Sequence, residues 1–100
     1  MTFEKVLEVF LVFLKEDSSC EVLNTRRGYL VVDWESSKNG WVTSRLCLTP
    51  ELLRDTLRSH WEEYQGYQLS GGYTREVSEQ EEQEIKRRGD ALTAKCGGAK

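Results

Sequence analysis

The sequence predicts an α+β fold in which a three-stranded antiparallel meander carries two helices packed on one face. The elements follow the order α-β-β-β-α, and a charged C-terminal helix completes the fold. Three observations lead to this prediction: an apolar segment with helical spacing at the start, three runs of strand-forming residues separated by turns, and a capped amphipathic segment after them. A chain of 100 residues with 38% hydrophobic residues has the size of one domain.

The first helix is predicted over residues 3–14, where nine of the twelve residues are apolar. Thr2 is the expected N-cap. At about 100° per residue, six apolar residues share one broad face: Phe3, Val6, Leu7, Phe10, Phe13 and Leu14. Leu11 and Val12 fall among the charged residues of the opposite face. The helix therefore has more apolar surface than one core contact requires.

Two explanations stay open for Leu11 and Val12: a later segment of the same chain covers them, or they contact a partner. We do not expect a secretory signal, because Glu4 precedes an interrupted apolar run that no small-residue cleavage site follows. The run is also too short to span a bilayer. We therefore expect no membrane association.

Three strands are predicted at residues 20–25, 28–36 and 41–48, joined by two tight turns. We expect a three-residue loop in each hairpin, so that Thr25 pairs with Tyr29 and Ser37 pairs with Trp41, with Gly40 in the left-handed conformation. Side chains alternate along a strand, so this register assigns every residue to a face. The inner face, under the helices, contains Cys20, Val22, Leu30, Val32, Trp34, Val42, Leu46 and Leu48.

The outer face of the predicted sheet has a mixed composition that is unusually aromatic for a face in contact with water. It contains Leu23, Tyr29, Val31, Asp33, Glu35, Trp41, Thr43, Arg45 and Cys47. Either the C-terminal helix folds back over this face, or the face binds a protein partner.

The second helix begins after Thr49, its expected N-cap, with Pro50 at the first helical position. An apolar stripe recurs at helical spacing through Leu53, Leu57, Trp61 and Tyr64. Gly66 is the expected C-terminal stop, and residues 67–74 are predicted to form a loop. This helix is expected to pack beside the first one on the inner face.

The C-terminal helix is predicted over about residues 78–92, because Ser78 and Glu81 form a capping-box signature. Acidic residues at its start and basic residues at its end complement the helix dipole. We assign the single domain to residues 1–92, with its core in residues 2–66. Residues 93–100 are expected to be a disordered tail.

The sequence offers few residues for catalysis or metal binding. His60 is the only histidine and is expected to be packed or at the surface. A zinc site built from Cys20, Cys47, His60 and Cys96 lacks the recognised ligand spacings. We therefore expect no catalytic residue, no metal and no cofactor. Three widely spaced cysteines, an odd number, favour a reducing, cytoplasmic setting over a disulfide framework.

The alternative function is a nucleic-acid-binding module. The element order through residue 65 is that of a double-stranded-RNA-binding domain, which is an analogy of topology only. Such domains grip phosphate with a basic cluster at the start of the last helix, whereas Thr49–Leu52 (TPEL) has no lysine. A net charge of −3 gives no broad attraction for phosphate. The basic candidates are Arg26, Arg27, Lys86, Arg87 and Arg88.

The favoured hypothesis is a small non-catalytic protein-interaction or regulatory protein, such as a binder-inhibitor or an adaptor. Its partner is a protein that the sequence does not identify, and self-association as a homodimer is one option. The exposed apolar pair on the first helix and the aromatic outer face motivate this hypothesis, since aromatic residues and arginine are enriched at interfaces. The interface candidates are Leu11, Val12, Leu23, Tyr29, Val31, Trp41 and Arg45.

Overall fold

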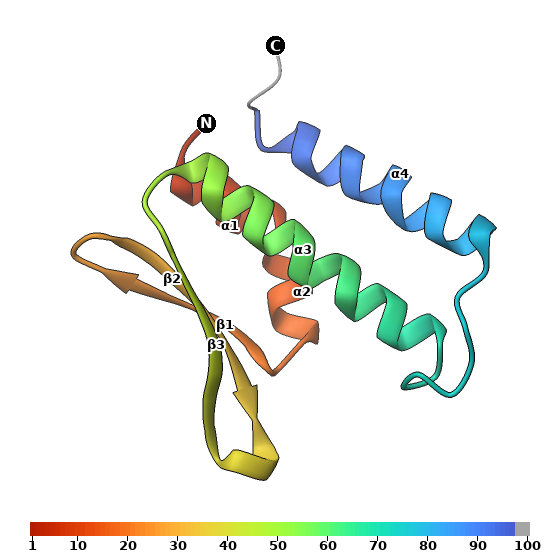
Figure 1. Ribbon diagram of the computed structural model, residues 1–100. Helices are drawn as coiled ribbons and strands as arrows, with labels where there is room; N and C mark the ends of the chain where they lie inside the picture. Colours follow the sequence, from red (N-terminus) through yellow and green to blue (C-terminus); the bar gives the residue numbers. More distant parts are fainter. Residues whose placement is uncertain (98–100) are drawn as a thin grey trace.

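The computed structural model describes residues 1–97, with the side chains of residues 43 and 44 left aside, and it has the predicted α+β fold (Figure 1). The element bounds are α1 Phe3–Val9, α2 Leu11–Glu16, β1 Cys20–Thr25, β2 Gly28–Glu35, β3 Gly40–Cys47, α3 Pro50–Leu69 and α4 Glu79–Lys95. A short 3-10 turn, Ser36–Lys38, joins β2 to β3.

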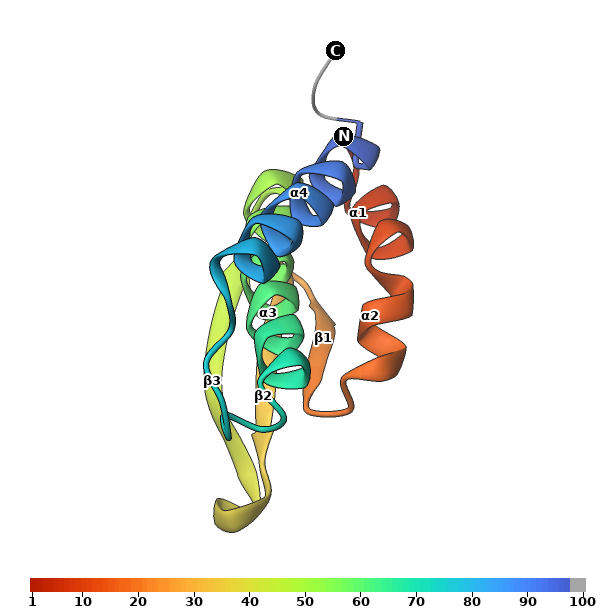
Figure 2. The same cartoon turned by 90° about the vertical axis from the view of Figure 1, so that its right-hand side faces the viewer.

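The described elements form layers. The sheet has the strand order β1-β2-β3, and both strand pairs are antiparallel. Helices α1, α2 and α3 lie over one face of the sheet (Figure 2). Helix α4 packs along α3 on the side away from the sheet (Figure 1, Figure 2). Helix α4 therefore does not fold back over the sheet, and the face of the sheet away from α1, α2 and α3 stays uncovered by the described elements (Figure 1, Figure 2).

The predicted first helix is divided at Phe10, whose φ and ψ are −94° and 10°. Helical hydrogen bonding continues across this residue, because Phe10 N–H donates to Val6 O at 3.1 Å and Leu14 N–H donates to Phe10 O at 3.0 Å. The predicted N-cap is confirmed, since Thr2 Oγ1 accepts a hydrogen bond from Lys5 N at 3.0 Å.

The first hairpin is one residue tighter than predicted. Residues 26 and 27 alone form the loop, so Thr25 pairs with Gly28. Gly28 has a φ of +146°, and a Cβ at this position would lie 2.3 Å from Cys47 O. The start of β2 thus approaches the backbone of β3 more closely than any other residue type permits. A slip of one residue also changes which side chains of β1 and β2 share a face.

The second hairpin is longer than predicted. The chain turns through Ser36–Lys38, and Asn39, in place of Gly40, adopts the left-handed conformation, which asparagine tolerates better than most residues. Pairs between β2 and β3, such as Leu30 with Leu46, are shifted by two residues from the predicted register. A two-residue shift preserves the faces, so residues 29–33 of β2 keep their predicted face relative to β3. A bulge between Asp33 and Trp34 then shifts the register by one more residue, so Trp34 pairs with Trp41, which was predicted to lie on the other face.

In β2 and β3, the helices cover the face that was predicted to be the outer one. Val31 and Cys47 are fully buried in the core, and the ring of Tyr29 lies 4.9 Å from the ring of Phe3. The assignment of Cys47 to the face opposite the helices is therefore wrong. Cys20 lies on the covered face as predicted, whereas Leu46 is exposed.

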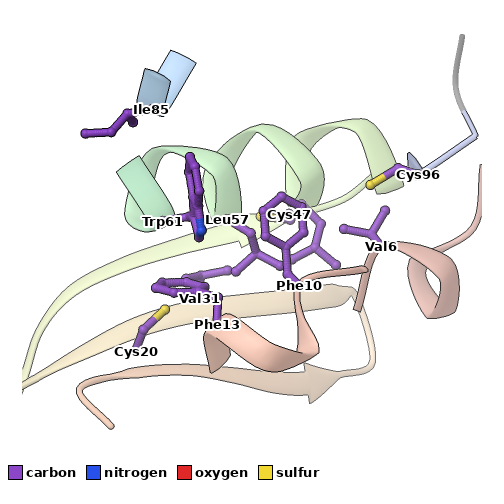
Figure 3. Packing of buried hydrophobic residues seen from close by; sticks show 11 residues of the cluster. Val6, Phe10, Phe13, Cys20, Val31, Cys47, Leu57, Trp61, Ile85 and Cys96 are labelled. Atoms are coloured by element: carbon purple, nitrogen blue, oxygen red, sulfur yellow. The ribbon is translucent and has the colours of Figure 1, made fainter. Parts of the chain in front are cut away.

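The core lies between the covered sheet face and the helices (Figure 3). It contains buried apolar residues from every layer: Val6, Phe10, Phe13, Cys20, Val31, Cys47, Leu53, Leu57, Trp61, Ile85 and Cys96. Three of the four residues of the predicted α3 stripe are in this list, and the fourth, Tyr64, is partly buried against the core. Helix α3 continues past Gly66, which was predicted to end it, to Leu69.

Helix α4 is longer than predicted and continues to Lys95. Cys96, which follows it, is fully buried, so the first part of the predicted disordered tail belongs to the folded structure. Residues 98–100 of that tail lie outside the described residues. The helix is held by Ile85 in the core and by Arg58 Nη1, which lies 2.8 Å from Asp90 Oδ1.

The start of α4 is a confirmed capping box, in which Glu81 N–H donates to Ser78 Oγ at 3.1 Å and Ser78 N–H donates to Glu81 Oε1 at 2.9 Å. Arg75 Nη2 also donates to Glu81 Oε2 at 2.9 Å. These hydrogen bonds, that of Arg75 above all, lower the pKa of Glu81 from 4.5 to about 2.

A carboxyl whose pKa is lower in the folded state contributes stability that is full above its unfolded pKa. We therefore expect this contribution to be lost as the pH falls from about 4.5 through about 2. A carboxyl-detected NMR titration of Glu81 should show a midpoint near 2, and Arg75→Ala should raise it. The control Arg87→Ala should leave the midpoint unchanged, and an ordinary glutamate midpoint in the unmodified protein would contradict the prediction.

Candidate protein interface

The uncovered face of the sheet carries a row of three leucines that crosses all three strands. Leu23 of β1 pairs with Leu30 of β2, which pairs in turn with Leu46 of β3. Directly paired residues in an antiparallel sheet project from the same face and contact each other. Leu23 and Leu46 are 37% and 40% exposed, and Leu30 is half-buried between them.

Beyond a register shift between Asp33 and Trp34, two tryptophans continue this apolar surface at the end of β2 and β3, where Trp34 also lines a hollow with His60 and Tyr64 of α3. The rings of Trp34 and Trp41 meet edge to face, with their centres 5.1 Å apart and their planes at 81°. They are 38% and 45% exposed, and they lie toward the end of the sheet that projects beyond the helices (Figure 1). We name the uncharged set Leu23, Leu30, Trp34, Trp41 and Leu46 the outer sheet patch.

Only some of the predicted interface residues lie on this surface. Leu23 and Trp41 belong to the outer sheet patch. Arg45 is exposed, but it pairs with Val31 and so projects from the same face as Val31, not from the uncovered one. Tyr29 and Val31 were predicted to be outward, but they lie under the helices, and Val31 is 1% exposed. The orientation of β2, which is inverted relative to the prediction, explains both errors.

Leu11 and Val12 form a second, separate apolar surface. They are 46% and 69% exposed, so no later segment among residues 1–97 covers them. Val12 borders a groove of about 300 Å³ between α2, α3 and α4, which Trp61 and Arg88 also line. Because α2 belongs to the helix layer over the covered sheet face (Figure 2), this pair and the outer sheet patch cannot belong to one flat interface.

The patch members that sequence reasoning missed are Leu30, Trp34 and Leu46, all of which were assigned to the inner face. Alternation along the strands correctly grouped them with one another. No local signal shows which face of a sheet the helices will cover when both faces carry apolar residues.

The basic candidates for nucleic-acid binding do not form one surface. Arg26 and Arg27 occupy the β1–β2 turn, on the opposite side of the helix layer from α4 (Figure 1). On α4, Arg87 Nη2 lies 2.6 Å from Glu84 Oε2, and the guanidinium of Arg88 lies 5.3 Å from the centre of the Trp61 ring. Arg87 and Arg88 thus have partners within the chain.

One cluster of chemically reactive side chains was not predicted: Cys20, Asp33 and His60. Cys20 and Asp33 are direct cross-strand partners in β1 and β2, and α3 places His60 beside them. One donor atom from each residue lies within 4.8 Å of the other two. His60 Nε2 lies 2.9 Å from Asp33 Oδ2, and His60 Nδ1 lies 2.9 Å from Thr56 O.

This cluster does not have the arrangement of a thiol nucleophile with its base. Burial and the carboxylates of Asp33 and Asp17 raise the pKa of the Cys20 thiol to about 12. A thiol is reactive only as the thiolate, and both ring nitrogens of His60 already contact other oxygens. The predicted register would have put Asp33 and Cys20 on opposite faces, which is why the cluster was missed.

The other two cysteines are packed at separate places in the core (Figure 3). Cys47 Sγ donates to Thr56 Oγ1 at 3.6 Å, and Cys96 Sγ donates to Leu92 O at 3.6 Å. Burial also raises the pKa of the Cys96 thiol. All three cysteines are buried and free.

No helix in the described part of the chain is long and apolar enough to cross a membrane. Comparisons of the chain with models of protein families, with curated proteins and with solved structures give no significant match.

Proposed function

We propose that this chain is a non-catalytic protein-interaction protein that binds protein through its outer sheet patch, and that a second copy of the chain occupies the patch. The observation that carries the proposal is the leucine row and tryptophan pair, left uncovered on a sheet whose other face is packed. Contiguous exposed apolar surface of this kind marks binding sites on small proteins. Tryptophan is also among the residues that contribute most to binding energy.

The composition of the patch supports a second copy as the occupant. A two-fold dimer brings the same residues of two chains together, so a charged patch would face like charges. All five patch residues are uncharged, and this repulsion is absent among them. Two sheets can pack face to face with their inner side chains interdigitated, which would bury both leucine rows.

The pair on α2 is a weaker candidate for the main contact. Leu11 and Val12 are only two residues, and the exposed charged side chains of Glu8, Lys15 and Glu16 belong to the same helical segment. Depletion of charge at the centre is typical of protein interfaces. The outer sheet patch, which has the single acidic residue Glu21 beside it on β1, meets this condition better than the α2 surface.

Two features of the side chains support a non-catalytic role in a reducing, cytoplasmic setting. The Cys20 thiol has a pKa of about 12, far from that of an activated nucleophile. The three cysteines are free and buried at separate places, which suits a compartment that keeps thiols reduced. Within this role the chain would act as a regulatory binder or an adaptor.

The test is the molar mass of the protein in solution, measured by light scattering over a wide range of concentrations. We expect twice the 11.6 kDa mass of the chain at high concentration, with dissociation on dilution. Leu46→Lys should yield a monomer with an unchanged circular dichroism spectrum, because a charge would be buried at the centre of the interface. Leu23→Lys should repeat this result on the neighbouring strand.

The matched control is Val12→Lys, which places the same charge on the exposed α2 surface and should leave the dimer intact. A monomer at all concentrations of the unmodified protein would overturn the choice of a second copy. A dimer that survives Leu46→Lys and is lost in Val12→Lys would move the interface to α2.

A further inference from the structure

The Cys20–Asp33–His60 cluster joins three elements at one end of the core. Cys20 begins β1, Asp33 lies opposite it in β2, and His60 comes from the middle of α3. The three side chains offer a sulfur, an oxygen and a nitrogen donor within 4.8 Å of one another. This is a ligand set that zinc and similar divalent metals accept.

The hydrogen bonds of His60 orient its ring as they do in many metal sites. Nδ1 lies 2.9 Å from the carbonyl oxygen of Thr56, so this nitrogen must carry a proton to make the bond. Metal-binding histidines commonly donate one ring N–H to a backbone carbonyl, which directs the other nitrogen toward the metal. In His60 that other nitrogen, Nε2, faces Asp33 Oδ2.

Two states of the cluster satisfy His60 Nε2. In one, the ring carries a second proton and pairs as an imidazolium with the Asp33 carboxylate. In the other, Nε2 keeps its lone pair and binds a cation together with Asp33. The Cys20 thiol favours the second state. Its sulfur atom can bind the cation together with Asp33 and His60, whereas it makes no contribution to an Asp33–His60 ion pair. Among the described residues, Cys20 Sγ has no hydrogen-bond partner, unlike the sulfurs of Cys47 and Cys96.

We propose that Cys20 Sγ, Asp33 and His60 Nε2 bind one divalent transition-metal ion of the zinc class, which links β1, β2 and α3. The charges balance, since a thiolate and a carboxylate neutralise a divalent cation and the histidine is neutral. Balanced charge matters at a site where Cys20 is buried. On binding, the thiol proton of Cys20 leaves to solvent, because a bound cation removes the proton of a coordinating thiol.

The site is accessible and needs only short side-chain movements. The side chains of His60 and Asp33 are 16% and 26% exposed. Both line a hollow of about 530 Å³ that also contains Asp17 and Glu63. A metal ion can enter through this hollow, and a water molecule from it can complete four-fold coordination. Donor atoms around tetrahedral zinc lie about 3.5 Å apart, somewhat closer than the outer limit of 4.8 Å here.

The test is titration of the reduced protein with cobalt(II) alone, which reports a metal–thiolate bond as a charge-transfer band in the near ultraviolet. We expect one cobalt ion per chain and such a band in the unmodified protein. Cys20→Ser should lose the band, and His60→Gln should weaken cobalt binding by roughly tenfold or more. Cys96→Ala is the matched control, because it removes another buried cysteine and should keep the band.

Thermal unfolding with zinc provides a second readout. Zinc should raise the melting temperature of the unmodified protein and of Cys96→Ala, and it should leave that of Cys20→Ser unchanged. Asp33→Asn, which preserves the shape of the side chain, should reduce the shift even if Cys20→Ser folds poorly. A band that is absent from the unmodified protein or that persists in Cys20→Ser would overturn the proposal. So would a zinc-induced shift that is equal in all the variants.

Discussion

Gly28→Ala is expected to lower the free energy of unfolding by about 3 kcal/mol or more, because two costs act at this position. The φ of Gly28 is +146°, a conformation that residues with a Cβ rarely adopt. The added Cβ would also lie 2.3 Å from Cys47 O and 3.2 Å from Cys47 C, both of which are backbone atoms. This steric clash can be relieved only if the end of β3 moves away from β2.

Urea denaturation monitored by circular dichroism measures this loss. Gly66→Ala is the matched control, because Gly66 lies inside α3 and a methyl group added there would meet no heavy atom within 4 Å other than the adjacent residues and backbone of its own helix. Alanine favours a helix interior over glycine, so Gly66→Ala should stabilise the protein by about 0.5–1 kcal/mol. The two substitutions should therefore act in opposite directions. If Gly28→Ala is as stable as the unmodified protein, the distance between the backbones of Gly28 and Cys47 is greater than in the structure, and the prediction is wrong.

Gly28 also explains why the sequence predicts the elements better than their arrangement. The caps at Thr2, Thr49 and Ser78 depend on residues within one helical turn, and all three are confirmed. The first hairpin depends on a contact between Gly28 and Cys47, which are far apart in sequence. With that contact unknown, Gly28 was assigned to the loop, and the register slipped by one residue.

The same contrast applies to the candidate sites. Alternation identifies Leu30, Trp34 and Leu46 as residues of one face, and this grouping is correct. The helices cover the sheet face that packs better against the apolar stripes of α1, α2 and α3. Val31 and Cys47, opposite α3, form the better-packed face, although they belong to the face with more polar residues. Position along the chain alone could not show this.

The Cys20–Asp33–His60 cluster depends on both kinds of information. His60 follows directly from the helical spacing of α3, since it precedes the buried Trp61. The pairing of Cys20 with Asp33 requires the two-residue loop of the first hairpin. A search for metal-ligand spacings in the sequence could not find this set, because its members are brought together by a hairpin and a later helix.

Phe10→Ala is expected to cost about 3–5 kcal/mol of unfolding free energy, which is a large part of the total for a small domain. Phe10 is 1% exposed and occupies the junction of α1 and α2, where it packs into the core with Val6 and Phe13. Removing the ring leaves a cavity between the helix layer and the sheet that the short helices α1 and α2 can fill only by moving. Urea denaturation at one fixed protein concentration gives the free energy, since dissociation of a dimer would add a concentration-dependent term.

Val12→Ala is the control within the same apolar segment. Val12 is 69% exposed, so its truncation should change the free energy of unfolding by no more than about 0.5 kcal/mol. The difference between the two substitutions tests how this apolar segment is divided between core and surface. Equal losses of unfolding free energy in the two variants would mean that Val12 is covered in solution. The α2 surface would then replace the outer sheet patch as the candidate binding site.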